Sequence, residues 1–240
     1  MNFASTLSAS PILHRPWSIC GQAPVQLWLA AYDVARFDSA MFVQAGVAQP
    51  ASIAKAVAKR QAEFFYGRLC AQAALAALGL HGVAVGTGAM REPLWPQGVI
   101  GSITHSADLA GALALPACQY RGVGIDIERY ADHNAHGAIE DVVLNRRELE
   151  LLRAQGATLG EAALLSLAFS AKESFYKAVF GMVQRFFDFS AIEIDALDIE
   201  QGTIGFTLAE TLCDDWRCGA RGQAGFELLG EQHVLTGVLW

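Results

Sequence analysis

Two long helical patterns, each accompanied by strand-like runs, constrain the fold of this 240-residue chain more than any other feature. The first covers residues 50–82, begins at a proline, spaces its apolar residues by three and four, and stops at a glycine. The second covers about 161–180 and follows a weaker helical stretch near 138–154. A strand, helix and strands therefore occur twice, which favours two α+β halves of similar build.

Strand-like runs surround these helices. Residues 24–37 are rich in β-branched and aromatic side chains, and residues 98–115 hold two short runs joined by a turn near 106–108. Another run begins near 122, and four more alternate between 190 and 240. A boundary near 116–121 gives two domains of ordinary size, residues 1–118 and 119–240.

Composition excludes several classes of protein. The chain is 53% hydrophobic and 17% charged, which is typical of a globular protein. It contains no uncharged apolar run of about 18 residues, so we expect no transmembrane helix. Residues 1–17 lack the basic and apolar regions of a signal peptide, and five scattered cysteines suit a reducing compartment. We therefore expect a cytoplasmic protein that does not bind membranes.

Charge argues against a nucleic-acid binder. The net charge is −7, and the chain contains no basic runs. A local group of basic side chains could still bind an anionic ligand against this overall sign.

The run GVGIDIERY, residues 122–130, places two carboxylates inside an apolar strand. Side chains alternate along a strand, so Asp126 and Glu128 share one face while Ile125 and Ile127 share the other. Two carboxylates this close repel each other unless a cation lies between them, and Mg²⁺ is the natural partner of hard oxygen ligands. The alternative is an edge strand with a solvated polar face.

The run FSAKESFYKAV, residues 169–179, supplies a third carboxylate. Ser170, Glu173 and Lys177 fall on one stripe of a helix. Alone, Glu173 and Lys177 indicate only a surface ion pair. Combined with Asp126 and Glu128, however, Glu173 completes a metal site, and Lys172 and Lys177 lie beside it. This combination suits the binding of phosphates.

The run REPLWPQGVIGSITHS, residues 91–106, combines a stiff basic loop with a polar turn. Hydroxyls, backbone N–H groups and His105 could hold a phosphate there. A lone histidine in such a segment is more often structural.

Together, the three motifs resemble the 4′-phosphopantetheinyl transferases, most closely the two-halved enzymes of the surfactin/enterobactin type. The resemblance covers roughly residues 55 to 180. It implies an α+β fold of two similar halves in a pseudo-twofold arrangement, with the active site in the cleft between them, and a monomer. It also implies transfer of the 4′-phosphopantetheine arm of coenzyme A (CoA) to a serine of an acyl or peptidyl carrier protein, with Mg²⁺ required and 3′,5′-ADP released.

The family's site residues carry over position by position. Asp126, Glu128 and Glu173 correspond to the Mg²⁺ ligands, and Glu148 corresponds to a proposed base, with its neighbour Glu150 as the less favoured alternative. The expected catalytic residues are Glu148, Lys177 and Glu173; the expected CoA-binding residues are Lys59, Arg60, Arg91, Ser102, Thr104, His105, Asp126, Lys172 and Lys177.

Within that set, Thr104 and His105 are expected at the 3′-phosphoadenosine end and Lys177 at the pyrophosphate, while the register between Lys59 and Arg60 stays open. The loop after the second helix lacks the basic residue that many relatives have, although Arg185 could replace it.

Three other functions compete with this interpretation. A dinucleotide-binding oxidoreductase is disfavoured, because GxGxxG needs glycine where Ile127 stands. A catalytically silent, carrier-binding homologue would be favoured by loss of a carboxylate, yet all three are present. Another Mg²⁺-dependent phosphotransferase could use the same three carboxylates.

Overall fold

The computed structural model describes residues 12–156 and 158–240. Residues 1–11 lie outside the described residues. The expectation that residues 1–17 are not a signal peptide therefore falls mostly outside what the structure describes. The chain divides into two compact units between Arg121 and Gly122, a few residues beyond the expected boundary. Unit 1 contains the described residues up to Trp17 and Pro24–Arg121; unit 2 contains Ser18–Ala23 and Gly122–Trp240. The sequence did not predict that Ser18–Ala23 would pack with the second unit.

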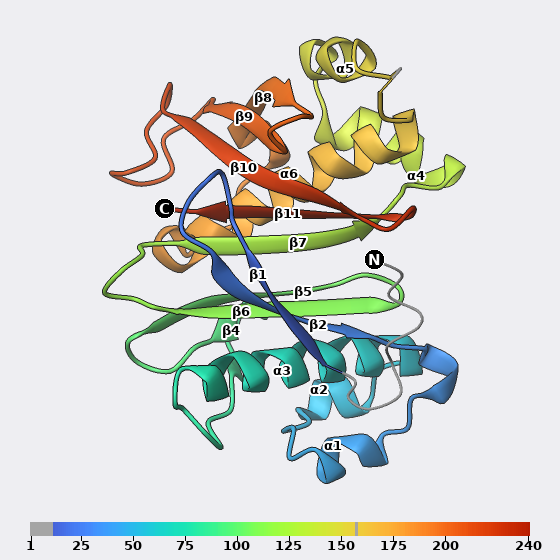
Figure 1. Ribbon diagram of the computed structural model, residues 1–240, viewed down its shortest axis with the longest axis vertical. Helices are drawn as coiled ribbons and strands as arrows, with labels where there is room; N and C mark the ends of the chain where they lie inside the picture. Colours follow the sequence, from blue (N-terminus) through green and yellow to red (C-terminus); the bar gives the residue numbers. More distant parts are fainter. Residues whose placement is uncertain (1–11, 157) are drawn as a thin grey trace. The chain divides into compact units, whose positions relative to one another are not determined.

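Unit 1 is built on a four-stranded antiparallel sheet in the order β1-β2-β6-β5 (Figure 1). Its strands are β1 (Leu13–Trp17), β2 (Val25–Ala31), β5 (Val99–His105) and β6 (Leu109–Pro116). The two runs expected within 98–115 are confirmed as β5 and β6. The run expected over 24–37 ends earlier, because Asp33 caps a short 3-10 helix, η2 (Val34–Arg36), by accepting a hydrogen bond from Ala35 N.

One long helix, α3 (Ala58–Ala77), packs against β2, β5 and β6 of this sheet. Small residues make the approach close: a methyl group on Gly67 would touch the side chain of Ile103. The predicted helix over 50–82 is wrong in extent. A separate turn, α2 (Ala51–Ala54), precedes α3, and Gln61 Nε2 bonds the carbonyl of Ala56 in the non-helical link. Unit 1 also contains α1 (Ala40–Gln44) and the hairpin of β3 (Gly86–Thr87) and β4 (Pro93–Leu94).

Unit 2 is built on a five-stranded antiparallel sheet in the order β7-β11-β10-β9-β8. The strands are β7 (Val123–Arg129), β8 (Ile192–Asp198), β9 (Thr203–Leu208), β10 (Arg221–Leu229) and β11 (His233–Leu239). They match the strand runs expected after residue 122. The α+β class is therefore confirmed in each unit.

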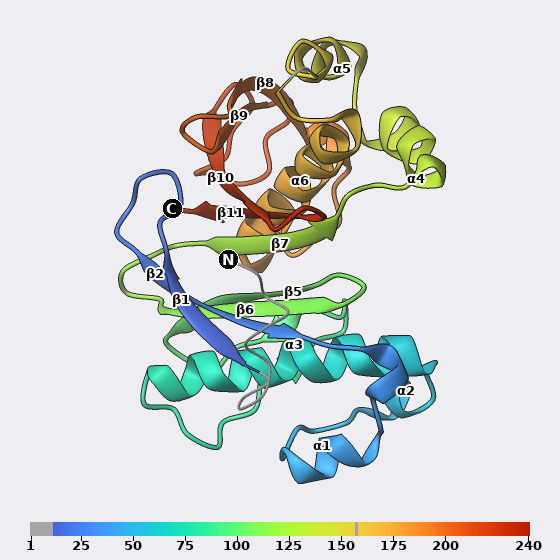
Figure 2. The same ribbon diagram turned by 45° about the vertical axis from the view of Figure 1, so that its right-hand side comes forward.

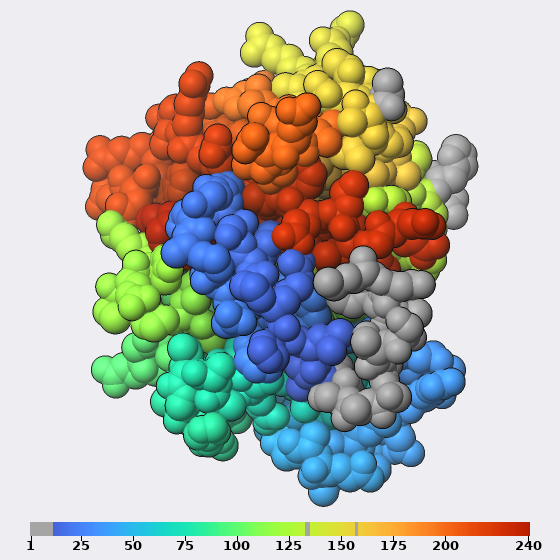
Figure 3. Space-filling model, in the orientation of Figure 1, coloured from blue at the N-terminus to red at the C-terminus, as the bar shows by residue number. Residues whose placement is uncertain are grey.

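The helix α6 (Glu161–Val183) lies along this sheet against β7, β11 and β10, as the turned view in Figure 2 shows. The helical stretch expected near 138–154 is divided into α4 (His133–Ala138), a π-helical turn η3 (Ile139–Val143) and α5 (Arg146–Arg153). Part of α5, yellow in Figure 3, lies at the surface of unit 2, whereas Glu148 and Leu152 of the same helix are buried. A 3-10 turn, η4 (Phe189–Ala191), leads into β8.

Two glycines set how closely α6 approaches β7. A methyl group at Gly124 would overlap the carbonyl oxygen of Ser174 and the backbone nitrogen of Ala178. One at Gly122 would overlap the carbonyl of Ala178 and the indole of Trp240. The two glycines of GVG therefore allow a helix to pack directly on the strand that carries Asp126.

Among the described residues, no helix combines the length and the apolar character that crossing a membrane requires.

Candidate active site

Asp126, Glu128, Glu173 and Lys177 form one group of charged side chains within unit 2, which we call the carboxylate cluster. Asp126 and Glu128 lie two residues apart on β7, on the same face as Gly124, and that face packs against α6. Asp126 is buried and Glu128 is half-buried. β7 is indeed the edge strand of the sheet of unit 2, but the solvated polar face of that alternative is wrong, because α6 covers the face that carries the two carboxylates.

The helix α6 supplies the other two members of the cluster. Glu173 and Lys177 lie one turn apart and are both half-buried. Lys177 Nζ donates to Asp126 Oδ1 at 2.5 Å, so its partner is on β7. The predicted surface pair of Glu173 and Lys177 is thus replaced by a bond between helix and strand.

The charges in the cluster change one another's ionisation. Burial, followed by the charges of Asp126 and Glu173, raises the pKa of Glu128 from 4.5 to about 8, although Lys177 opposes the change. Burial also raises the pKa of Glu173, with Asp126 adding to it and Lys177 opposing it. Burial alone would lower the pKa of Lys177, but Asp126, Glu173 and Glu128 together raise it. Three carboxylates therefore share one ammonium.

This group has the chemistry of a Mg²⁺ site. Within the described ranges, no three His, Cys, Asp or Glu side chains lie close enough to hold a metal ion as they stand. The donors are nevertheless all carboxylate oxygens, and the burial and mutual repulsion that raise the pKa of Glu128 and of Glu173 show that Lys177 alone does not offset the negative charge of the cluster. A divalent cation with oxygen ligands would balance that excess, so the residues fit the ion.

Glu148 and Lys172 form a second buried ion pair and lie elsewhere than expected. Lys172 Nζ is 2.7 Å from Glu148 Oε1, and both side chains are about 2% exposed or less. Lys172 also donates to the carbonyls of Val143, Phe189 and Ile192. Burial lowers its pKa, although Glu148 opposes this. The ammonium of Lys172 is therefore bonded inside unit 2, whereas its side chain also lines the aromatic pocket described below, so its expected contact with CoA stays a prediction.

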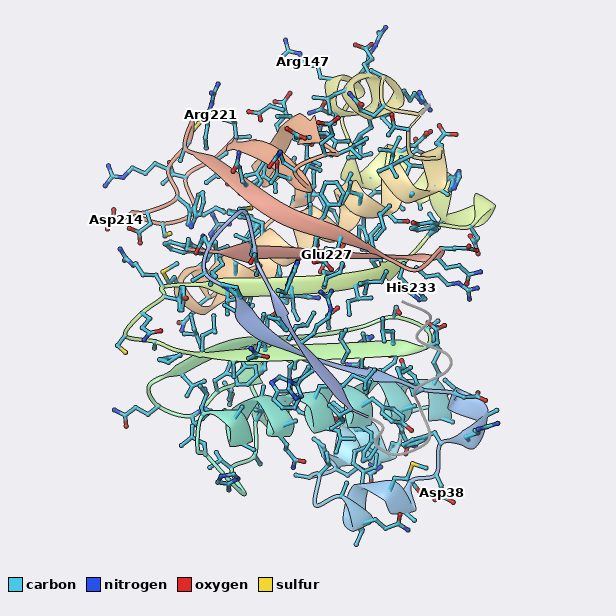
Figure 4. The ribbon with its side chains drawn as sticks, viewed as in Figure 1. Asp38, Arg147, Asp214, Arg221, Glu227 and His233 are labelled. Carbon is cyan, nitrogen blue, oxygen red and sulfur yellow. The ribbon has the colours of Figure 1, made fainter. Side chains whose placement is uncertain are left out.

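The carboxylate of Glu148 is occupied in the same way. Oε1 accepts a hydrogen bond from Ile194 N, and Oε2 accepts one from Asn145 N in the capping box at the start of α5. The neighbouring Arg147 points outward from the unit (Figure 4). Glu148 thus connects α5, α6 and β8, and the structure does not bring it to the carboxylate cluster. The expectation that it is the base does not agree with this burial.

In unit 1, Arg60 and His105, two of the residues expected to bind CoA, lie side by side. Arg60 on α3 lies 3.0 Å, through Nη1, from His105 Nε2 at the end of β5. Lys59 is exposed, so the geometry favours Arg60 in the open register. The sequence analysis missed Glu63, whose Oε2 lies 3.2 Å from Arg60 Nη1. The spacing of Arg60 and Glu63, one turn apart, was the available signal.

The remaining residues expected to bind CoA have varied positions in unit 1. Ser102 and Thr104 are buried, and they point to the face of β5 opposite that of His105. Arg91 is exposed in the turn of the β3–β4 hairpin, with a left-handed φ of 68°. Arg68, at 9% exposure, supports that hairpin by donating to Gly86 O and Thr87 Oγ1.

An aromatic pocket of about 280 Å³ lies beside the carboxylate cluster within unit 2. Its lining includes Glu173 and Tyr176 of α6 and the aromatic residues Phe186, Phe187 and Phe189 that follow it. The hydroxyl of Tyr176 is buried and has no hydrogen-bond partner among the described residues. Arg185 lies in the same loop and forms an ion pair with Glu210, with 3.7 Å between Nη2 and Oε2.

Models of known families match both units. The 4′-phosphopantetheinyl transferase N-terminal domain matches residues 48–115, and the 4′-phosphopantetheinyl transferase superfamily matches residues 122–236. The second range contains the whole carboxylate cluster. The chain belongs to the family of 4′-phosphopantetheinyl transferases, and the resemblance drawn from its motifs is confirmed.

Individual relatives agree with this family. The chain is similar to the 4′-phosphopantetheinyl transferase Svp of Streptomyces mobaraensis, with 36% identity over 79% of this chain and 76% of Svp. It is also similar to PptT of Mycobacterium tuberculosis, with 35% identity over 68% of this chain and 70% of PptT. The match to Npt of Nocardia iowensis has 38% identity and covers 63% of this chain and 65% of Npt, just under two thirds of that relative.

Proposed function

We propose that this protein transfers the 4′-phosphopantetheine arm of CoA to a serine of an acyl or peptidyl carrier protein. The carboxylate cluster carries the proposal, because three carboxylates and a lysine meet where β7 packs on α6. Such a group suits a divalent cation and the diphosphate of CoA. Membership of the family and the names of the relatives support the same activity.

In the proposed reaction, the serine oxygen attacks the β-phosphorus of CoA. The bond between that phosphorus and the bridging oxygen breaks, and 3′,5′-ADP leaves. Asp126, Glu128 and Glu173 would hold Mg²⁺, which offsets charge on the diphosphate when bound. Lys177 lies beside these carboxylates and would stabilise the departing phosphate.

The serine proton needs an acceptor within reach of solvent and substrate. Glu148 is 1% exposed and its oxygens are bonded inside the unit, so we propose Glu173 in its place. Glu173 is partly exposed, and it lines the pocket that would receive the pantetheine arm, so its carboxylate is within reach of both solvent and substrate.

Each unit, taken by itself, offers residues suited to one part of coenzyme A. We propose that Arg60 and His105 bind the 3′-phosphoadenosine end, with Arg91 adding charge. The aromatic pocket beside Glu173 would receive the mostly apolar pantetheine arm, and the Tyr176 hydroxyl would bond one of its amides.

A single assay tests the activity. The protein is incubated with CoA, Mg²⁺ and an apo carrier protein, and the carrier is analysed by mass spectrometry for a phosphopantetheine arm on its serine. We expect modification that depends on CoA and stops with a chelator. Binding of the carrier without modification would favour a silent homologue, whereas phosphoryl transfer without CoA would favour a different Mg²⁺-dependent phosphotransferase.

A further inference from the structure

Glu63 is a partly buried carboxylate beside two residues expected to bind an anion. Its side chain is 13% exposed, compared with 43% for Arg60 and 34% for His105. Its Oε2 lies 3.2 Å from Arg60 Nη1 and 4.0 Å from His105 Nδ1. The most buried of the three side chains is therefore the one that faces both of the others.

The hydrogen bond between Arg60 and His105 fixes how the imidazole is oriented. A guanidinium has only donors, so Arg60 Nη1 donates and His105 Nε2 accepts at 3.0 Å. A neutral imidazole then carries its proton on Nδ1, which is the nitrogen that faces Glu63. Glu63 thus orients both side chains, in the way that a carboxylate orients a histidine in many sites.

The surroundings hold Glu63 itself in place. It lies on α3, one turn after Arg60, and α3 packs against the strand that ends at His105. Tyr32 stacks on Tyr66 of the same helix, with ring centroids 4.6 Å apart, and donates to Ser106 O next to His105. The carboxylate of Glu63 is therefore carried by a helix that packs firmly against the sheet of unit 1.

We infer that Glu63 is a positioning residue, which holds Arg60 and His105 ready for the 3′-phosphate of CoA without touching the substrate. This inference rests on the proposed function. An arginine left without its partner samples many rotamers, and ordering such a side chain on binding lowers the affinity for the ligand. With two side chains to order, losing Glu63 should weaken binding of the 3′-phosphate by about tenfold.

The test compares Glu63→Gln with the wild type on CoA and on 3′-dephospho-CoA. We expect KM for CoA to rise about tenfold while kcat stays within about twofold, because no group at the reacting phosphorus changes. KM for 3′-dephospho-CoA should stay the same. Glu63→Asp, which keeps the charge, should recover part of the loss. Glu200→Gln, an exposed glutamate of unit 2, is the control for removing one negative charge.

Several results would overturn the inference: an unchanged or lower KM for CoA, or an equal rise for both substrates, which would indicate a general structural effect. Calorimetry with 3′,5′-ADP and with 5′-AMP measures how much the 3′-phosphate contributes to binding, without any transfer reaction. If the wild type modifies no carrier yet binds 3′,5′-ADP more tightly than Glu63→Gln does, the proposed function fails and the inference stands. If Glu63→Gln does not fold, Glu63→Asp is compared with the wild type instead: weaker binding of 3′,5′-ADP with unchanged binding of 5′-AMP supports the inference, and an equal loss for both nucleotides contradicts it.

Discussion

At the scale of single residues, two lysines five positions apart on α6 lie in different environments. Lys177 reaches the carboxylates of β7, whereas Lys172 is enclosed with Glu148 and three backbone carbonyls. Five residues correspond to roughly 500° of helical rotation, which places the two side chains on different faces. The burial of each lysine decides whether its charge is available to a ligand.

Replacing Glu128 should change how stability depends on pH. The folded protein keeps the Glu128 proton up to a pKa of about 8, whereas the unfolded chain loses it near 4.5. Since the folded state binds more protons in this window, stability falls as pH rises from about 4.5 to about 8. Without metal, Glu128→Gln should therefore have a higher Tm than the wild type at pH 8, and the advantage should disappear below pH 4.5. A difference in Tm that is constant across this range would contradict the prediction.

Replacing Glu148 should affect stability before activity. Removing one member of a buried ion pair leaves the other charge uncompensated, and this typically costs about 3–5 kcal/mol. We expect Glu148→Gln to lose about 3 kcal/mol of unfolding free energy in urea. Glu150→Gln removes an exposed partner of Arg146 on the same helix and should lose well under about 1 kcal/mol.

The same variant separates a structural role from a catalytic one. Where Glu148→Gln remains folded, it should keep most of its transferase activity. Normal stability combined with a large loss of kcat would instead make Glu148 the base.

At the scale of secondary structure, the carboxylate cluster depends on how closely one helix, α6, approaches one strand, β7. Gly122 and Gly124 let α6 lie against β7, and Thr236 of β11 bonds to Ser170 and Ser174 of the same helix. These contacts fix the rotation of α6 and so direct Glu173 and Lys177 toward Asp126. The two glycines therefore allow both the close packing of α6 on β7 and the formation of the carboxylate cluster.

Gly124→Ala should test that dependence. The added methyl group would overlap backbone atoms of Ser174 and Ala178, so the helix must move away from the strand. Overpacking of this kind typically costs about 1–3 kcal/mol, and we expect a similar loss in urea denaturation. Because the carboxylates then separate, transfer activity should fall more than tenfold even at temperatures where the variant is folded. Gly181→Ala, at an open position on the same helix, is the matched control; an equal loss there would contradict the prediction.

At the scale of the whole molecule, each unit supplies a different chemistry. Unit 2 contains the carboxylates suited to a metal and a diphosphate, and unit 1 contains Arg60 and His105, suited to a phosphate monoester. The net charge of −7 does not prevent anion binding, since local groups determine it.

Magnesium should stabilise the protein through Asp126. A ligand that binds only the folded state raises stability by RT ln(1 + [L]/Kd), about 2.7 kcal/mol at 100 times Kd. We expect Mg²⁺ to raise the Tm of the wild type, and Asp126→Ala to abolish both that rise and the transfer activity while the variant still folds. The exposed substitution Asp198→Ala is the control. Transfer by Asp126→Ala at the wild-type rate would refute the metal site.

The sequence by itself determined the family, the α+β class and the residues of the carboxylate cluster. It could do so because strand alternation and helical periodicity fix which side chains share a face, and because the three motifs occur in a characteristic order. It also indicated His105 and a basic residue at the start of the first long helix, although the choice between Lys59 and Arg60 stayed open.

Only the tertiary structure decided which charges are available. Glu148 and Lys172 carry the same charges as Glu173 and Lys177, and no local pattern separates the two pairs. Glu148 and Lys172 are buried between α5, α6 and β8, where their charges stabilise the fold. Glu173 and Lys177 reach the carboxylates of β7 because α6 approaches that strand closely at Gly124. Glu63 was missed for the same reason: its importance comes from His105, 42 residues further along the chain, and contacts of that kind exist only after the helix has packed on the sheet.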